Sequence, residues 1–271
     1  MVYGYHPPTR HSHTRTLLMC GIAAVFLYPT ERPPEMWAEI RRSFTDNLLF
    51  NEVRGREATG VALLRQGAPA SVFKRPVPAH EFVKRPFYTT LLRTLNAQTT
   101  LILGHTRRPT KGSPANGDNN HPIQAGDVIG VHNGHINNDD LLFANCDCER
   151  AGEVDSEIIF RLLWHELDGA FGDVGLTAVK SNLQKLEGKF VVLAGDQRQP
   201  NKLLVVKRNN PLSLHYHLQW QALIFSSRYI FLRKTFGRVV LKETLSSDKI
   251  FIFDAEKLPQ LQARAMRTIS L

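Results

Sequence analysis

A cysteine at position 20 stands directly after Met19 and directly before the apolar run 21–27, which we predict to be a β-strand. If the peptide bond after Met19 is absent, the free α-amino group of Cys20, whose ordinary pKa is about 7.7 to 8.0, can accept the thiol proton directly or through one water. Such a thiol needs no histidine to become a nucleophile. Taken alone, a single cysteine before a strand is more often a small buried apolar residue. Cys20 is therefore a candidate nucleophile whose activation depends on where the working chain begins.

Other segments behind "CGI" add residues that fit the same chemistry. They are "RGREATG" (54–60), "GHTRRPTKG" (104–112), "HNGHINN" (132–138) and "VDSE" (154–157). In this order and spacing they closely resemble the class II glutamine amidotransferases. That group is a branch of the N-terminal nucleophile hydrolases and includes the glutaminase domains of glucosamine-phosphate synthase and amidophosphoribosyltransferase. The resemblance extends from Cys20 to about Asp254.

The resemblance implies a catalytic set. Cys20 is expected to attack the side-chain amide of L-glutamine, releasing ammonia and leaving a γ-glutamyl thioester. The side chain of Asn133 and the backbone N–H of Gly134 are expected to form the oxyanion hole, where two donors must converge on the developing negative charge. On propensity alone, Asn133 and Gly134 also indicate a tight hairpin turn after a strand.

The resemblance also implies a substrate-binding set. Arg107 is expected to bind the carboxylate of glutamine with its planar guanidinium, and Asp155 to pair with the ammonium group. Thr110, in the same loop as Arg107, and Arg54 with Gly55, beside the nucleophile, complete the set. Taken singly, Arg107 is equally well a surface arginine and Asp155 a helix N-cap. The residue after Arg107 is often aromatic in the sugar-phosphate branch, but here it is Arg108, which puts that branch's ammonia route in doubt.

The residue composition is that of an ordinary globular protein, with 42% hydrophobic and 22% charged residues and no apolar run long enough to cross a membrane. The net charge of +9 is local, because residues 54–111 hold eleven Lys or Arg against two acids. This basic stretch is either a solvated face or a site for an acidic partner or substrate. Three cysteines make a disulfide framework unexpected and favour a reducing, cytoplasmic setting, with Cys146 and Cys148 in an ordinary loop.

The order of apolar patterns predicts an α+β fold with mostly antiparallel strands. We expect strands at 21–27, 61–64, 101–104, 128–132, 190–194, 203–206, 212–216, 222–225 and 250–253. A first helical period runs through Met36, Trp37, Ile40, Phe44 and Leu48. Further helices are expected at 82–95, 158–167 and 176–186. A long polar loop from Gly104 to Asp127 is expected to be functional. The resemblance implies a four-layer αββα sandwich, with two antiparallel sheets face to face and helices outside.

Three segments are expected along the chain: a leader, pro-segment or mis-assigned start over 1–19, the amidotransferase domain over 20–254, and a C-terminal tail over 255–271. The tail is too short for a synthase or ligase domain, so ammonia is expected to pass to a separate acceptor enzyme. No cofactor is expected. His105, His121 and His132 match no metal-binding signature, and no metal is expected.

Two other functions stay open on sequence. A γ-glutamyl amidohydrolase that acts on a larger metabolite would use the same fold and nucleophile. A catalytically silent binding module would result if residues 1–19 are retained, because the amine of Cys20 would then be held in a peptide bond.

Overall fold

The computed structural model of the chain describes residues 19–166, 175–237, 243–261 and 267–271. Of the expected leader, only Met19 lies within the described residues. The strands are β1 (Gly21–Leu27), β2 (Ala58–Arg65), β3 (Ala68–Arg75), β4 (Thr99–Arg107), β5 (Ile123–Ala125), β6 (Val128–Ile136), β7 (Gly188–Asp196), β8 (Gln199–Arg208), β9 (Ser213–His217), β10 (Ala222–Ser226), β11 (Glu243–Thr244), β12 (Lys249–Asp254) and β13 (Arg267–Ser270). The helices are α1 (Pro34–Asn51), α2 (Ala79–Phe82), α3 (Pro86–Arg93), α4 (Asp139–Ala144), α5 (Glu157–Glu166), α6 (Gly175–Gln184), α7 (Tyr229–Phe236) and α8 (Leu258–Leu261), with short 3-10 turns η1 (Glu52–Arg54), η2 (Gly117–Asn119) and η4 (Ala255–Lys257).

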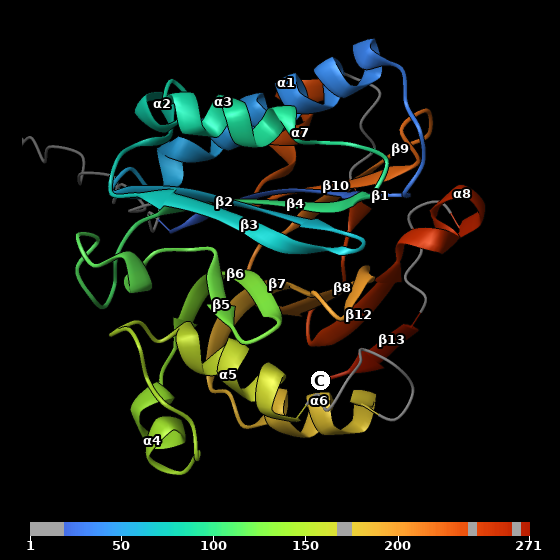
Figure 1. Cartoon of the computed structure of the whole chain (residues 1–271). Helices are drawn as coiled ribbons and strands as arrows, with labels where there is room; N and C mark the ends of the chain where they lie inside the picture. The colour runs from blue at the N-terminus through green and yellow to red at the C-terminus, as the bar shows by residue number, and fades with distance from the viewer. Residues whose placement is uncertain (1–18, 167–174, 238–242, 262–266) are drawn as a thin grey trace, which may run out of the picture.

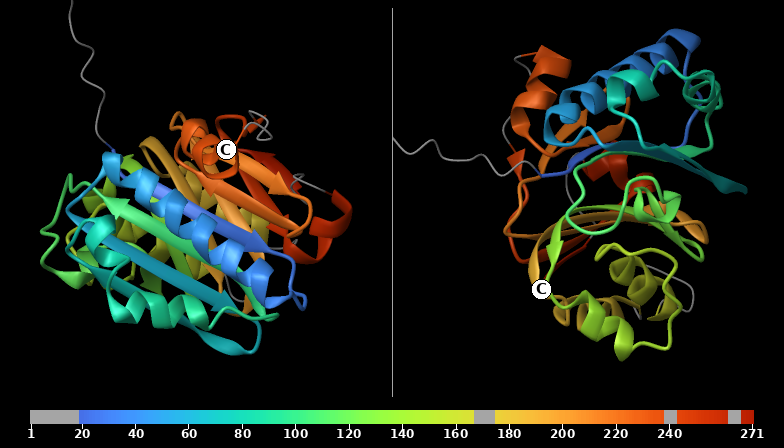
Figure 2. Two further views of the ribbon diagram at one scale, coloured as in Figure 1. Left: turned by 90° about the horizontal axis from the view of Figure 1, so that it is seen from above. Right: turned by 90° about the vertical axis from the view of Figure 1, so that its left-hand side faces the viewer.

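The strands form two sheets in which neighbouring strands are antiparallel. The first has the order β11-β9-β10-β1-β4-β2-β3, and the second β13-β12-β8-β7-β6-β5. Figure 1 shows them face to face, with α1, α2, α3 and α7 over the outer face of the first sheet and α5 and α6 over that of the second. The side view in Figure 2 separates the same layers. The predicted α+β, four-layer αββα architecture is confirmed.

Three apolar clusters hold these layers together. One lies under α1 and α3, one between the sheets and one under α5 and α6. Helix α1 illustrates the outer contact: Trp37, Ile40, Phe44 and Leu48 recur every three or four residues and bury one face against the first sheet. Its start is fixed by Pro34 in the first turn, where a missing N–H costs nothing.

Each predicted strand corresponds to an observed one, although several observed strands are longer by three or four residues at one end, and the predicted helix over 82–95 is shorter, because only α3 (Pro86–Arg93) lies in its interior. Helix α2 ends at Phe82 and α3 begins at Pro86, because proline cannot donate the hydrogen bond that would continue the first helix. The predicted helices 158–167 and 176–186 correspond to α5 and α6, with residue 167 outside the described residues.

Two predicted irregular stretches contain strands. The expected loop from Gly104 to Asp127 is shorter, since β4 runs on to Arg107 and β5 occupies Ile123–Ala125. In the stretch expected to be a tail, β13 pairs with β12, so the second sheet extends past Asp254.

The expectation that the cysteines form no disulfide is wrong for one pair. Cys146 and Cys148 are joined, with their Cα atoms 5.2 Å apart, because the turn after α4 brings residues two positions apart within bridging distance. No helix in the described part of the chain has the length and apolar character needed to cross a membrane.

Candidate active site

Cys20 lies immediately before β1, a central strand of the first sheet. The pairing of β1 with β4 places Gly21 opposite Thr106, so Cys20 lies beside the end of β4 and the loop that follows Arg107. The thiol and the backbone of Arg108 are in hydrogen-bond contact, with Sγ 3.3 Å from both the Arg108 N and O atoms. This register brings together two residues 88 positions apart in the sequence.

The thiol is in its protonated form in this environment at neutral pH. Burial raises the pKa of Cys20 to about 11, and the Arg108 amide and the charges of Arg107 and Arg54 offset this only in part. Since the described hydrogen bonds of Sγ reach only the Arg108 backbone, no side-chain base contacts it there. A base must therefore come from elsewhere.

Arg54 and Gly55 lie next to Cys20, the predicted nucleophile. The Arg54 Nε donates to the Cys20 carbonyl oxygen at 2.8 Å, and its guanidinium is buried. A Cβ at Gly55 would lie 2.3 Å from the carbonyl carbon of Arg107, so only glycine allows these two segments to approach so closely. A cavity of about 370 Å³ adjoins this contact, lined by Glu52, Val53, Arg54, Gly55, Arg56, Glu57 and Arg108.

Arg107 is buried and organises the loop that follows it. Its guanidinium donates to the carbonyl oxygens of Lys111 and Gly112 at 2.6 and 2.8 Å, and to Asn120 Oδ1 at 2.9 Å. Among the described contacts these bonds use both Nη2 hydrogens and one Nη1 hydrogen, which leaves Nε and the second Nη1 hydrogen for a ligand. Arg107 thus shapes the loop and retains donors for a carboxylate.

Asn133 and Gly134 lie inside β6, so the hairpin turn indicated by propensity is wrong. They pair with Val191 and Phe190 of β7. Gly134 has a φ of 142°, and a Cβ there would lie 2.1 Å from the Lys189 carbonyl oxygen. A side chain is excluded at this position on both grounds.

The peptide between Asn133 and Gly134 has a fixed orientation. One edge of β6 pairs with β7, and the other edge pairs with β5 only as far as Gly130. After Gly130 this other edge is open to other groups, and there the Ile136 N–H donates to Asp155. Because N–H groups alternate along a strand, the Gly134 N–H points to the same open edge. On the opposite side, Asn210 Nδ2 donates to the Asn133 carbonyl oxygen at 2.5 Å. A trans peptide directs its N–H away from its carbonyl oxygen, which agrees with this direction.

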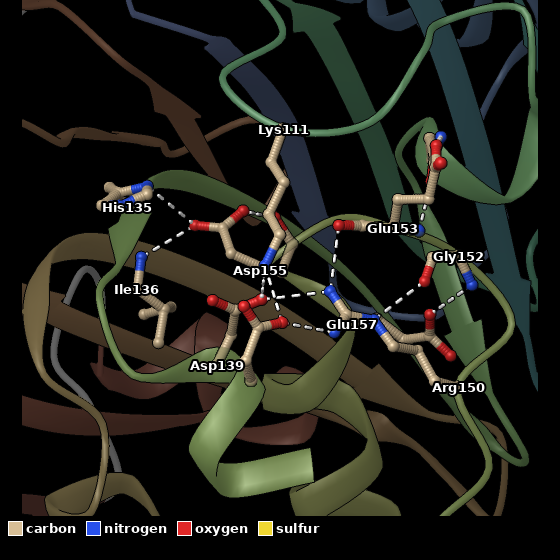
Figure 3. A network of polar contacts seen from close by, with 12 residues as sticks. Lys111, His135, Ile136, Asp139, Arg150, Gly152, Glu153, Asp155 and Glu157 are labelled. Carbon is tan, nitrogen blue, oxygen red and sulfur yellow. Dashed lines mark hydrogen bonds and ion pairs between the residues drawn. The ribbon is translucent and has the colours of Figure 1, made fainter. Parts of the chain in front are cut away.

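Asp155 is a buried carboxylate at the same end of β6. Its Oδ2 accepts from the Ile136 N–H at 2.8 Å and lies 3.3 Å from His135 Nδ1 (Figure 3). Its negative charge acts on the Cys20 thiol and raises that pKa, in opposition to Arg107 and Arg54. The site therefore has positive and negative groups close to one thiol.

Thr110 is the one predicted site residue that this arrangement does not bring in. It is exposed in the loop and has no described hydrogen bond to the other predicted residues. Of the remaining seven, Cys20, Arg54, Gly55, Arg107 and Asp155 lie around one thiol, while Asn133 and Gly134 are in β6 just before Ile136, which donates to Asp155.

Comparisons with known proteins agree with this geometry, although no protein-family model matches the chain. A glutamine–fructose-6-phosphate aminotransferase of Corynebacterium diphtheriae is 31% identical over 203 residues, which cover 72% of this chain and 30% of that enzyme. A solved glutamine phosphoribosylpyrophosphate amidotransferase from B. subtilis superposes with a TM-score of 0.62 at 16% identity, covering 93% of this chain and 49% of that one. A glutamine aminotransferase class-II domain protein from Silicibacter pomeroyi gives a TM-score of 0.55 at 15% identity, with 93% and 99% covered.

The chain is a homologue of the class II glutamine amidotransferases. The predicted resemblance is confirmed, and with it the prediction of an enzyme of this class. The chain spans less than half the length of the first curated relatives that it matches, 30% and 43% in two of them. These relatives do not favour the alternative of a γ-glutamyl amidohydrolase for larger metabolites.

Sequence reasoning missed a group of ion pairs that hold the loop of this amidotransferase domain. Lys111 Nζ lies 2.7 Å from Asp139 and 2.8 Å from Asp140 at the start of α4, and Arg150 contacts the same two carboxylates (Figure 3). Hydrogen bonds from Lys111 and Arg150 lower the pKa of Asp140 to about 2, so this carboxylate stays ionised until the pH falls to that range. The only sequence signal was the pair of acids that opens the helix.

The three histidines considered as metal ligands are buried together beside the site. The rings of His105 and His121 are 4.2 Å apart and those of His121 and His132 are 6.3 Å apart. Burial lowers the pKa of each, so all three are neutral at pH 7. Among the described residues, no group of three or more His, Cys, Asp or Glu is arranged to hold a metal ion.

Proposed function

We propose that this chain hydrolyses the side-chain amide of L-glutamine through Cys20 and passes the ammonia to a separate acceptor enzyme. The observation that supports the proposal is that Arg107 and Asp155 act on the charge state of the Cys20 thiol, while Asn133 and Gly134 lie in β6 just before Ile136, which donates to Asp155. We propose that the side chain of Asn133 and the N–H of Gly134 face the same thiol. Free glutamine has one amide carbonyl, one carboxylate and one ammonium group, and the site offers a complement to each.

In the first step, the Cys20 thiolate attacks the amide carbon. The Sγ–C bond forms and the carbonyl π electrons move to the oxygen, where Asn133 Nδ2 and the Gly134 N–H stabilise the negative charge. The α-amino group of Cys20 accepts the thiol proton and then donates it to the leaving nitrogen. The C–N bond breaks, ammonia leaves, and a γ-glutamyl thioester remains.

In the second step, water attacks the thioester and releases glutamate. The same amine accepts a proton from the water, and the thiol is restored. Arg107 holds the substrate carboxylate and Asp155 the ammonium group through both steps, which keeps the amide carbon over Sγ. The raised pKa of the thiol makes a built-in base necessary, so we propose a working form that begins at Cys20.

The basic stretch 54–111 supports transfer to a partner. Two of its eleven cations, Arg54 and Arg107, are buried, while Arg56 and Arg108 are exposed and line the 370 Å³ cavity to which Arg54 and Gly55 also contribute. We propose that the acceptor enzyme, or its acidic substrate, docks over this cavity.

The test compares two forms of the protein, one that begins at Cys20 and one that retains Met19. Each is incubated with glutamine, and glutamate and ammonia are measured. Each is also incubated with 6-diazo-5-oxo-norleucine, followed by intact mass and peptide mapping. We expect turnover and a single adduct at Cys20 only in the form that begins there.

Cys20→Ala in the same processed form is the control and should show neither turnover nor adduct. An inert processed form, or an adduct on Cys146 or Cys148 instead, would overturn the proposed function. Turnover by the form that retains Met19 would leave the glutaminase but contradict the built-in base.

A further inference from the structure

Ser227 lies immediately after β10 and is fully buried beside the strand of the nucleophile. Its Oγ accepts a hydrogen bond from the Ile22 N–H at 2.7 Å, and its own N–H donates to the Ile22 carbonyl oxygen at 3.0 Å. Ser227 thereby extends the pairing of β10 with β1 to the residue two positions after Cys20.

The same hydroxyl reaches the second sheet. Asn133 Nδ2 lies 3.4 Å from Ser227 Oγ, although the residues are 94 positions apart. Asn133 is fully buried, and its Oδ1 has no hydrogen-bond partner among the described residues. One serine thus connects the nucleophile strand to the side chain proposed for the oxyanion hole.

Counting protons at this contact shows an imbalance. The Ile22 N–H can only donate, so Ser227 Oγ must accept from it. With Asn133 Nδ2 also donating, no described acceptor remains for the serine proton, and Asn133 Oδ1 remains without a donor. Buried polar groups are nearly always paired. Rotating the Asn133 amide by 180° about its Cβ–Cγ bond gives a partner to both the serine proton and Asn133 Oδ1, because Ser227 Oγ–H then donates to Oδ1.

We infer that Ser227 is a positioning residue, and that it sets which end of the Asn133 amide faces the substrate during the reaction. With Oδ1 held by Ser227, the Nδ2 group is on the side away from Ser227, where one of its hydrogens can donate to the oxyanion. With the amide reversed, the lone pairs of Oδ1 would face that negative charge and repel it. The inference rests on the proposed glutaminase function and adds a residue that acts through Asn133.

The experiment uses Ser227→Ala in the form that begins at Cys20. We expect kcat for glutamine to fall about 10- to 100-fold, below the loss for removal of a whole oxyanion donor, with KM changed less than about 3-fold. The γ-semialdehyde of glutamate tests the same donor separately. When Cys20 adds to its aldehyde, the Sγ–C bond forms, the π bond of the carbonyl breaks, and the α-amino group takes the thiol proton. The former carbonyl oxygen then occupies the oxyanion position, so the affinity for the semialdehyde should fall by a factor similar to kcat.

Two controls separate positioning from damage to the structure. Ser226→Ala removes the adjacent, equally buried hydroxyl, which accepts from Asn51 of α1 and does not contact Asn133. It should lower the melting temperature to a similar degree and leave kcat within about 2-fold. The rate of Cys20 alkylation by iodoacetamide, which needs no oxyanion hole, should be unchanged in Ser227→Ala.

An unchanged kcat and semialdehyde affinity in Ser227→Ala would overturn the inference, and so would an equal loss in alkylation rate. If Ser227→Ala does not fold, the test compares Ser227→Thr with Ser227→Val, because the two side chains have the same shape and only threonine keeps the hydroxyl. Equal kcat values for these two variants would overturn the inference. A wild-type processed form with no glutaminase activity would instead refute the proposed function. The two failures are therefore distinguishable.

Discussion

The chemistry at the residue scale depends on the protonation of one thiol. Cys20 lies between Arg54 and the Arg108 backbone, yet burial outweighs these stabilising groups and the pKa rises to about 11. Only the thiolate is a nucleophile, so the raised pKa lowers its fraction at neutral pH. Gly134 shows the opposite kind of constraint, since its positive φ and the nearby Lys189 carbonyl leave room for no side chain.

The pH dependence of Cys20 alkylation follows from this pKa. In the form that retains Met19, the rate with iodoacetamide should rise about tenfold per pH unit from pH 7 to 9.5 with no plateau, because the midpoint lies near 11. In the form that begins at Cys20, the rate should level off between about pH 8 and 9, as the amine of ordinary pKa about 7.7 to 8.0 takes up the proton. Peptide-resolved mass spectrometry measures both; one common profile would contradict the built-in base.

At the scale of elements, the loop after β4 is held from both sides. Arg107 binds the carbonyl oxygens of Lys111 and Gly112 from within, and the Lys111 side chain reaches the start of α4. Of the two acids there, the side chain of Asp139 is 6% exposed and that of Asp140 is 72% exposed. Because solvent weakens exposed ion pairs, Asp139 should carry most of the restraint.

Asp139→Asn should therefore loosen the loop that follows Arg107, the arginine proposed to bind the substrate carboxylate. We expect KM for glutamine to rise about 3- to 10-fold with a smaller change in kcat, and trypsin to cleave faster after Lys111. Asp140→Asn is the matched control, since it removes the same charge on the same helix turn and should change KM less than about 2-fold. If the two variants raised KM equally, the difference in burial between Asp139 and Asp140 would not determine which ion pair restrains the loop.

At the scale of the whole molecule, the contact between the two sheets places β1 and β4 against β6 and so creates the site. Phe225 of the first sheet and Phe253 of the second meet there, with ring centroids 5.7 Å apart, in a cluster that also contains Ile22 next to Gly21. Interior apolar contacts of this kind decide both stability and the relative placement of the sheets.

Phe253→Ala tests this contact, because Phe253 is fully buried between the sheets. We expect the free energy of unfolding to fall by about 3 to 5 kcal/mol in denaturant titration. Leu218→Ala, at a side chain that is 69% exposed, should change it by less than about 0.5 kcal/mol. A small effect of Phe253→Ala would mean that the sheets do not depend on this cluster.

Local pattern was enough for much of this protein. The position of β1 after Cys20, the long strands of both sheets and the main helices follow from apolar periodicity and proline placement, which act over a few residues. The site residues Cys20, Arg54, Gly55, Arg107, Asn133, Gly134 and Asp155 were identifiable because their segments resemble a known family in order and spacing. Their roles in glutamine hydrolysis remain predictions.

Contacts between distant residues were decided only by the tertiary structure. The place of Asn133 and Gly134 inside β6 depends on β7, some 55 residues later, and overrides a turn propensity that is purely local. Ser227 and Asn210 gave no sequence signal, and the ion pairs of Lys111 gave only the two acids that open α4, since the contacts of a single serine, asparagine or lysine depend on the atoms that folding places around it. Sequence thus determined which groups are available for chemistry, whereas the packing of the two sheets decided which of them meet.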